Sequence, residues 1–329
     1  MNSQQPSLAQ GLLAGQRGAL ARAITWAENA DRRFPQLLED VYAAVGRSHR
    51  LGVTGPPGAG KSTLVNQLAR HLRELERTVG ILAVDPSSPF TGGALLGDRI
   101  RMEERTLDPG VFIRSMASRG SRGGLARATV DAFDVMDAFG FDQLIVETVG
   151  VGQAEYDVVG AADTVLVVLC PGAGDGVQAM KSGVLEVADV LCINKADLPG
   201  ADRMVADLEE AVHIRTAGKG LWMPPVVSVS AGTDQGLDGL LEAIQSHRAW
   251  LEAEGRLQLS RQEQRLDQVQ RVLREGFDHA IWEGRGLEGY ARAMIKASRT
   301  PHGAAERILE QLKAALPSEW AQVQEETQP

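Results

Sequence analysis

A glycine-rich run at residues 55–62 has the residue types and the spacing needed to bind phosphate. It reads Gly-Pro-Pro-Gly-Ala-Gly-Lys-Ser, a match to GxxxxGK(S/T) between a strand-like and a helix-like run that a chance glycine-rich turn rarely makes. The glycines let successive backbone N–H groups turn toward an anion, and the helix that follows adds the positive end of its dipole. Lys61 adds a mobile positive charge for the β- and γ-phosphates, and Ser62 adds a hydroxyl for Mg²⁺. The predicted nucleotide contacts here are Gly55, Pro56, Pro57, Gly58, Ala59, Gly60, Lys61, Ser62 and Thr63.

A second motif bears on which base the nucleotide carries. An apolar run at 190–193 leads into Asn-Lys-Ala-Asp at 194–197. The Asp197 carboxylate can accept hydrogen bonds from both the ring N–H and the exocyclic amine of guanine, whereas adenine would leave it desolvated and unpaired. The Lys195 stem can lie over the base plane, and Asn194 is expected to link loops. A backbone N–H after the next predicted strand is expected to meet the guanine carbonyl, so the sequence favours GTP over ATP. This third part of the predicted base site comprises Ser230, Ala231 and Gly232.

Three carboxylates are candidates for an Mg²⁺ site. Asp85 and Glu147 each end an apolar, strand-like run, and carboxylates at the carboxyl edge of a parallel sheet face the ligand crevice. Each can hold Mg²⁺ directly or through water, although Asp85 can instead be a cap or turn residue before Pro86. Asp98 lies in a glycine-containing stretch that can join the metal site when it orders around the γ-phosphate. The predicted metal ligands are Ser62, Asp85, Asp98 and Glu147.

Two further segments hold candidates for hydrolysis. Gln153 follows Glu147 closely and can position the attacking water, with a solvated loop glutamine as an equal alternative. The loop at 171–176 has glycine or proline at four of six positions, and Lys181 is a polar residue that it can present to a nucleotide or a partner. The predicted catalytic residues are Lys61, Glu147, Gln153 and Lys181.

Composition narrows the class of protein. The 329 residues carry a net charge of −9, which disfavours nucleic-acid binding because that needs clustered Lys and Arg. No apolar run approaches the roughly 20 residues of a membrane span, and residues 1–5 lack the layout of a signal peptide. The two cysteines, Cys170 and Cys192, lie in apolar runs and are expected to be buried free thiols. The cytoplasm is the expected compartment.

The order of the elements predicts an α/β fold with a mostly parallel sheet. Residues 49–250 alternate short β-rich runs with helical stretches, after a helical segment at 1–48 and before a helical arm at 251–329. Near-continuous apolar runs are typical of parallel strands that helices cover on both faces. In the arm, the apolar stripe Leu266, Val269, Leu273 and Phe277 either packs on its own domain or serves dimerisation. The predicted strands are Arg50–Thr54, Ile81–Val84, Phe112–Arg114, Gln143–Val146, Thr164–Leu169, Val190–Ile193 and Val226–Val229.

Taken together, these motifs resemble the MeaB/ArgK-type GTPases, a family of SIMIBI-like, metallochaperone-like P-loop proteins. The resemblance implies GTP and GDP binding, slow GTP hydrolysis, and Mg²⁺ at Ser62, Asp85, Asp98 and Glu147. It also implies a chaperone of an adenosylcobalamin-dependent acyl-CoA mutase, typically methylmalonyl-CoA mutase, that gates cofactor delivery and protects or reactivates the enzyme. Homodimers that form through a C-terminal helical arm are a further implication. The matching segments are 55–62, 83–88, 92–102, 146–153, 171–175 and 194–197.

Two other functions stay open at this point. An older label for the family is a kinase that acts on amino-acid transport components, and it requires a phosphorylated product. A nickel- or cobalt-insertion GTPase usually carries His-rich or Cys-x-x-Cys segments, whereas the six histidines of this chain are unclustered and its two cysteines are far apart. The sequence does not name the mutase that a chaperone of this kind would serve.

Overall fold

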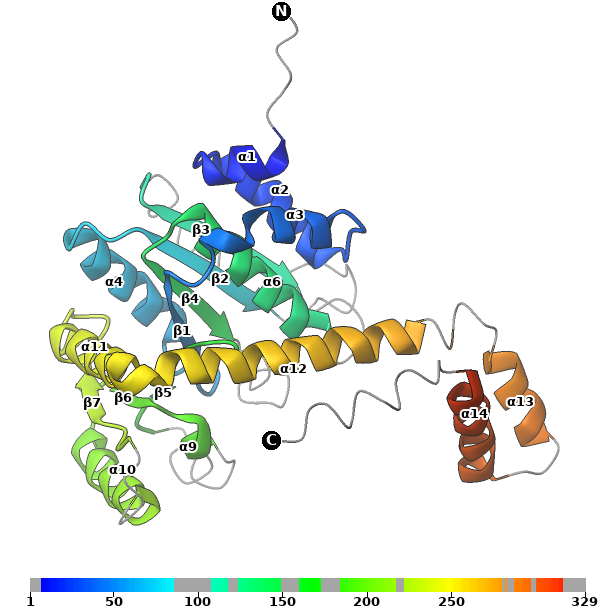
Figure 1. Ribbon diagram of the computed structural model, residues 1–329. Coiled ribbons are helices and arrows are strands. Elements are labelled where there is room, and N and C mark those ends of the chain that lie inside the picture. The colour runs from blue at the N-terminus through cyan, green and yellow to red at the C-terminus, as the bar shows by residue number, and fades with distance from the viewer. Residues whose placement is uncertain are drawn as a thin grey trace, which may run out of the picture. The chain divides into compact units, whose positions relative to one another are not determined.

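The strands form one seven-stranded parallel β-sheet in the computed structural model (Figure 1). The structure describes residues 7–85, 108–117, 124–148, 160–172, 184–216, 222–279, 282, 287–296 and 300–315. The strand order is β3-β2-β4-β1-β5-β6-β7. The strands are β1 (His49–Thr54), β2 (Val79–Asp85), β3 (Val111–Ala117), β4 (Gln143–Thr148), β5 (Thr164–Leu169), β6 (Val190–Asn194) and β7 (Val226–Val229).

Helices cover both faces of this sheet, because parallel neighbours need long crossover connections. The strands β1, β4, β5 and β6 are buried along their whole length. The covering therefore explains their near-continuous apolar sequences. The helices that follow the strands are α4 (Lys61–Glu74), α6 (Gly124–Phe139), α9 (Val184–Val187), α10 (Ala201–Thr216) and α11 (Leu237–Glu252).

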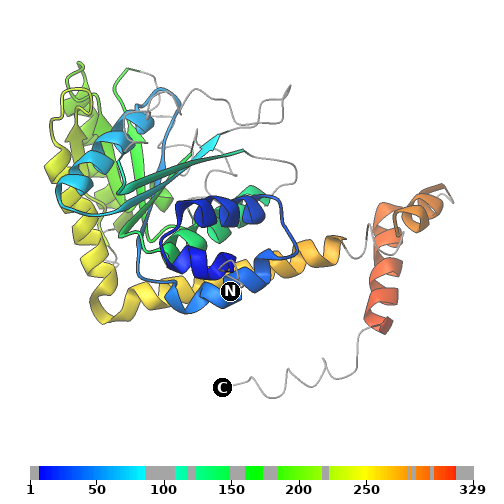
Figure 2. The ribbon, with the colours of Figure 1, turned by 90° about the horizontal axis from the view of Figure 1, so that it is seen from above.

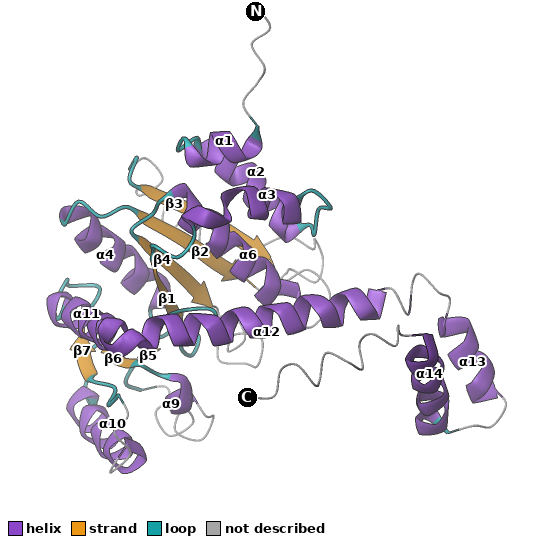
Figure 3. Ribbon diagram, in the orientation of Figure 1, coloured by secondary structure: helices purple, strands orange, loops and turns teal. Residues whose placement is uncertain are grey.

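Alternate side chains of each strand point to opposite cores. On β5, Leu166 and Val168 join the core beneath α4 and α11, whereas Val165 and Val167 join the core beneath α10. At the other end of the sheet, α6 covers the same face as α10, over β2, β3 and β4. Figures 2 and 3 show the strands between these two helical layers.

The N-terminal helices pack on α6. They are α1 (Leu8–Leu13), α2 (Arg17–Glu28), α3 (Phe34–Val41) and the 3₁₀ turn η1 (Tyr42–Ala44). Ser7 starts α1 with a capping box, because its hydroxyl accepts from the Gln10 backbone N–H and the Gln10 side chain accepts from the Ser7 N–H. Leu20 and Ile24 of α2 are fully buried in the core that α6 shares. The predicted helical segment is thus part of the layer that covers β2, β3 and β4.

The C-terminal part is helical, as predicted. It comprises the turn η3 (Ala253–Gly255), α12 (Arg256–His279), α13 (Leu287–Lys296) and α14 (Pro301–Ala315). The chain divides into two compact units, Met1–Asp267 and Gln268–Pro329. The division into 1–48, 49–250 and 251–329 stays a prediction. None of the helices in the described ranges is long and apolar enough to span a membrane.

The predicted fold class is confirmed: a parallel sheet, helices on both faces, and helical additions at both ends. Cys170 and Cys192 are both buried and free, as expected from their apolar surroundings. Burial raises the pKa of the Cys192 thiol far above its ordinary value, so this thiol is protonated and inert.

Candidate nucleotide-binding site

The glycine-rich loop joins the carboxyl end of β1 to the first residue of α4. In the sheet, β1 lies between β4 and β5. The loop therefore leaves the sheet at the point where the order of the strands changes direction. A ligand crevice is expected at this switch point of an open α/β sheet. The structure therefore places the phosphate-binding motif at the position that the fold favours for a ligand.

Two glycines of the loop are required by close contacts. Gly55 has φ +142°, and a Cβ added there would lie 2.0 Å from the Val168 carbonyl oxygen on β5. Gly60 has φ +88° and precedes α4, and an added Cβ would lie 2.4 Å from Asn194 Nδ2. Any other residue would strain the backbone and push the loop away from β5 or from the end of β6. The glycine pattern thus fixes the loop against its two neighbouring strands.

Lys61 and Ser62 begin α4 with their side chains directed to the loop and to β4. Lys61 Nζ donates to the carbonyl oxygens of Gly55 at 2.8 Å and Pro56 at 3.0 Å. Ser62 Oγ donates to Glu147 Oε1 at 2.6 Å. Glu147 is 5% exposed and lies beside Val53 in the parallel register of β1 and β4. A cation, a hydroxyl and a buried carboxylate therefore converge at the start of α4.

Asn194, at the end of β6, holds three segments together. Its Nδ2 donates to the Ala59 carbonyl oxygen at 2.9 Å, and its Oδ1 accepts from the Ala231 N–H at 3.1 Å. The side chain is buried, and the Asn-Lys-x-Asp segment, the glycine-rich loop and the Ser230–Gly232 turn meet at it. This matches the linking role that the sequence predicts for Asn194.

Asp197 and Lys195 are held by the same turn and loop. Ser230 Oγ donates to Asp197 Oδ1 at 2.9 Å and accepts from the Asp197 N–H at 3.1 Å. Lys195 adopts φ +56°, and its Nζ donates to the Gly58 carbonyl oxygen at 2.8 Å. Ser230 bonds to Oδ1 of the Asp197 carboxylate, and Oδ2 takes no part in that hydrogen bond. The predicted base residues thus lie beside the predicted phosphate residues.

The remaining predicted residues are placed in part. Thr63 is exposed in the first turn of α4, and Gly232 is exposed beside Ala231. Asp85 ends β2 opposite Ala117 of β3, and its side chain lies outside the described part. Asp98, Gln153 and Lys181 lie outside the described residues altogether.

One contact to the Ser230–Gly232 turn was not predicted from the sequence. Gln67 of α4 donates through Nε2 to the Ala231 carbonyl oxygen at 3.2 Å. Gln67 lies two turns beyond the glycine-rich loop, on a helix whose side chains read only as an amphipathic pattern. The position of Ala231 depends on a chain segment 164 residues away, which no local pattern reveals.

A strand, a glycine-rich loop and a helix, joined through Asn194 to an Asn-Lys-x-Asp segment, place this protein among the P-loop GTPases. Known proteins agree. The family model for "Methylmalonyl Co-A mutase-associated GTPase MeaB" matches residues 20–285. The chain belongs to the MeaB family, and it is a GTPase of that family.

Several relatives match over most of the chain. A Pyrococcus abyssi (strain GE5 / Orsay) protein, named provisionally as a GTPase, is 44% identical over 93% of this chain and 96% of its own length. GTPase ArgK of Escherichia coli (strain K12) is 36% identical over 87% of this chain and 88% of its own. The mitochondrial methylmalonic aciduria type A homolog of Mus musculus is 35% identical over 77% of this chain and 65% of its own.

A solved structure also matches. The crystal structure of a LAO/AO transport system kinase has a TM-score of 0.72 and 29% identity. The match covers 94% of this chain and all of that one. The likeness therefore extends beyond the sheet to the helices at both ends of the chain.

Proposed function

We propose that this GTPase binds Mg²⁺ and GTP at the site described above and acts as a chaperone of an adenosylcobalamin-dependent acyl-CoA mutase. The observation that supports the nucleotide site best is the pair of hydrogen bonds by which Asn194 joins the glycine-rich loop to the Ser230–Gly232 turn. These bonds bring phosphate-binding and base-binding motifs together from segments about 135 residues apart in the chain.

In this proposal the nucleotide replaces the loop's internal contacts. The β- and γ-phosphates take the place of the Gly55 and Pro56 carbonyls as partners of Lys61, because an ammonium binds phosphate oxygens more strongly than neutral carbonyls. Asp197 receives the two guanine N–H donors, and the Lys195 stem covers the base. Gln153 orients the attacking water, and Lys181 contacts the γ-phosphate or the partner.

The donor set at the start of α4 suits Mg²⁺. Ser62 and Glu147 supply a hydroxyl and a carboxylate whose oxygens are 2.6 Å apart, and both are the hard oxygen ligands that Mg²⁺ prefers. Among the residues described, no group of three or more His, Cys, Asp and Glu side chains is placed to hold a metal ion. Mg²⁺ does not need such a group, because it takes one or two carboxylates together with phosphate oxygens and waters. Asp85 and Asp98 complete the proposed site.

The mutase partner rests on the family. Its model is named for a GTPase associated with methylmalonyl-CoA mutase, and a mouse relative is named for methylmalonic aciduria. We propose that GTP binding and hydrolysis gate delivery of the cobalamin cofactor to the mutase and protect or reactivate that enzyme. Methylmalonyl-CoA mutase and related acyl-CoA mutases are the candidate partners.

The exposed stripe on α12 supports a homodimer. Leu266, Val269, Leu273 and Phe277 recur every three or four residues, and each is about half exposed. An apolar stripe of this length on one helix costs free energy in water until another apolar surface covers it. A second copy of the same helix supplies a matching stripe, so the proposed dimer forms through this arm.

A capture experiment tests the proposed partner. The purified protein is immobilised with GDP in one arm and a non-hydrolysable GTP analogue in the other, and proteins retained from native lysate are identified by mass. We expect an adenosylcobalamin-dependent acyl-CoA mutase to be retained in amounts that depend on the nucleotide. Retention of a transporter component or a nickel enzyme in its place would contradict the proposal. A Lys61→Ala variant serves as the control, because its capture should no longer depend on the nucleotide.

A further inference from the structure

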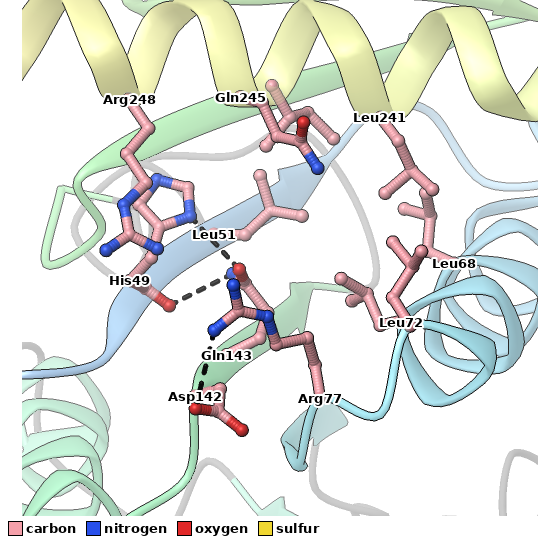
Figure 4. Close-up of a pocket in the computed structure, with 12 residues that line it drawn as sticks. His49, Leu51, Leu68, Leu72, Arg77, Asp142, Gln143, Leu241, Gln245 and Arg248 are labelled. Atoms are coloured by element: carbon pink, nitrogen blue, oxygen red, sulfur yellow. Dashed lines mark hydrogen bonds and ion pairs between the residues drawn. The ribbon is translucent and has the colours of Figure 1, made fainter.

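A cavity of about 370 Å³ lies at the amino ends of the strands, whereas the nucleotide site lies at their carboxyl ends. It opens between α4 and α11, over the amino ends of β1 and β4 (Figure 4). This volume falls within the range of roughly 300–1,000 Å³ that is usual for small-molecule pockets. The cavity is separate from the glycine-rich loop, because its α4 residues, Leu68 and Leu72, lie two and three turns beyond Lys61.

One end of the cavity is aliphatic. Leu51, Leu68, Leu72, Leu241 and Ile244 line it, and each is at least nine-tenths buried. Figure 4 shows the leucine side chains of α4 and α11 gathered on the same side of the cavity. Each methylene group moved from water into such surroundings strengthens binding by about fourfold. This end therefore suits the hydrocarbon part of a ligand.

At the other end, the buried polar side chains are already satisfied by one another. His49 Nδ1 lies 3.1 Å from Gln143 Oε1, and His49 Nε2 lies 2.9 Å from Thr164 Oγ1. Gln143 Nε2 donates to the His49 carbonyl oxygen at 3.0 Å. Burial lowers the pKa of His49, so its imidazole is neutral near pH 7. These two residues form a neutral wall and offer no charge to a ligand.

At the mouth of the cavity, several hydrogen-bond donors have no partner among the described residues. Arg248 donates through Nε to Glu252 at 2.8 Å, and no described hydrogen bond involves its two Nη atoms. Among the described residues, the Arg77 side chain makes only a long ion pair, with Nη1 3.8 Å from Asp142 Oδ1. The Gln245 side chain also makes no hydrogen bond to a described residue, and it points toward the cavity in Figure 4.

The acidic groups at the mouth, in contrast, are occupied. Asp142 Oδ2 accepts from the Thr78 N–H and hydroxyl at 2.8 Å each, and its Oδ1 faces Arg77. Glu252 Oε1 accepts from Arg248. Asp142 lines the mouth, and Glu252 lies behind it as the partner of Arg248. These two carboxylates balance the two guanidiniums, so net charge does not attract a ligand here. The donors without a described partner decide its chemistry, because a guanidinium binds both oxygens of a carboxylate more strongly than it binds water.

The geometry points to a binding site for a short aliphatic monocarboxylate, with its hydrocarbon chain among the leucines of α4 and α11 and its carboxylate at Arg248 and Arg77. This site is independent of the proposed GTP and mutase functions. Its ligand is recognised by aliphatic length and by a terminal carboxylate, and neither feature is read by the glycine-rich loop.

Isothermal titration of the full-length protein with sodium hexanoate tests the site. We expect saturable binding with one hexanoate per chain. Its affinity should be about tenfold or more above that of butanoate, because butanoate buries two fewer methylenes. Hexylammonium should not bind, because the unused groups are donors. Saturating GDP should leave the hexanoate stoichiometry unchanged, which separates this cavity from the anion-binding loop.

A matched pair of variants locates the carboxylate. Arg248→Gln should weaken hexanoate about tenfold, as expected for a lost charge-assisted hydrogen bond, and should leave 1-hexanol binding unchanged. Arg203→Gln removes a cation from a comparable i,i+4 ion pair on α10, with Asp207, and should behave as wild type. The proposal is wrong if hexanoate binding is not saturable or is lost in GDP. It is equally wrong if hexylammonium binds as well, or if the two variants bind hexanoate alike.

Discussion

The side-chain amide of Asn194 donates a hydrogen bond to the carbonyl oxygen of Ala59 across 2.9 Å. The first residue ends β6 and the second lies in the glycine-rich loop, so this bond joins the base-binding and phosphate-binding halves of the candidate site. The Asn194 oxygen also accepts from the Ala231 N–H. The geometry of both halves therefore depends on one buried amide.

Replacing that amide should loosen both halves together. Asn194→Ala leaves the Ala59 carbonyl and the Ala231 N–H without their partner, at a cost of about 2–4 kcal/mol in the free energy of unfolding. Urea unfolding measures this cost, and fluorescence titration should show weaker GDP and GTP binding. Asn29→Ala, at an exposed position after α2, is the control and should change neither. Equal stability of the two variants would contradict the linking role.

Lys61 should matter for phosphate binding rather than for folding. Lys61→Ala removes the one side-chain charge of the motif, which is directed to the β- and γ-phosphates. GTP affinity should therefore fall by about tenfold to a hundredfold. Equilibrium binding of a fluorescent GTP analogue measures this loss. Arg203→Ala, which removes an exposed cation on α10, should bind GTP as wild type does. Unchanged affinity in Lys61→Ala would refute the phosphate assignment.

Asp197 should decide the identity of the base. An amide in place of the carboxylate offers a donor to the extra carbonyl of xanthine and loses one of the acceptors that guanine needs. Asp197→Asn should therefore shift preference from GTP toward XTP, measured by competition between the two nucleotides. Retention of the full preference for GTP would show that the base is bound elsewhere.

The ion pair between Arg261 and Asp163 predicts a change in acid stability. Arg261 donates to both oxygens of the fully buried Asp163 carboxylate, at 2.8 and 2.6 Å. Burial alone would raise the Asp163 pKa, but the Arg261 hydrogen bonds and charge outweigh it and hold this pKa below its usual value. Because the folded-state pKa is lowered, the stabilisation is present above the unfolded pKa of about 3.9 and is lost as pH falls through the folded-state pKa.

Arg261→Gln should therefore move acid unfolding to higher pH and lower the free energy of unfolding near pH 7 by about 3–5 kcal/mol. Circular dichroism during acid titration measures the first effect, and urea unfolding measures the second. Arg33→Gln breaks an exposed pair with Asp31 at 2.6 Å and is the matched control, with a much smaller expected change. Identical acid midpoints in the two variants would be inconsistent with this pair as a stabilising contact.

How much of the fold was predictable depends on how local its signals are. The run Thr164–Leu169 was predicted with the bounds that β5 has, because six apolar or β-branched residues in sequence require burial on both faces. The third strand was predicted as Phe112–Arg114 but extends over Val111–Ala117. The polar residues Arg114 and Ser115 hide the rest of the strand from a pattern of apolar residues. In the structure Arg114 is neutralised by Glu28 of α2, a partner that no local pattern reveals.

The candidate site divides in the same way. Candidate residues in contiguous motifs, such as Lys61 and Asp197, can be proposed from the sequence because the chemistry demands a fixed order along the chain; their binding roles stay predictions. The contacts that position them join distant segments: Gln67 to Ala231, and Ser62 to Glu147. Such pairs depend on strand order, and order is set by the packing of the whole sheet rather than by any segment.

The rate of GTP hydrolysis by the purified protein, alone and with purified methylmalonyl-CoA mutase, tests the proposed chaperone function most directly. We expect slow turnover to GDP and free phosphate that requires Mg²⁺, is absent in Lys61→Ala, and changes severalfold when the mutase is added. A rate that is the same with and without the mutase, or phosphate transferred to a protein rather than released, would contradict the proposed function as a GTPase chaperone of the mutase.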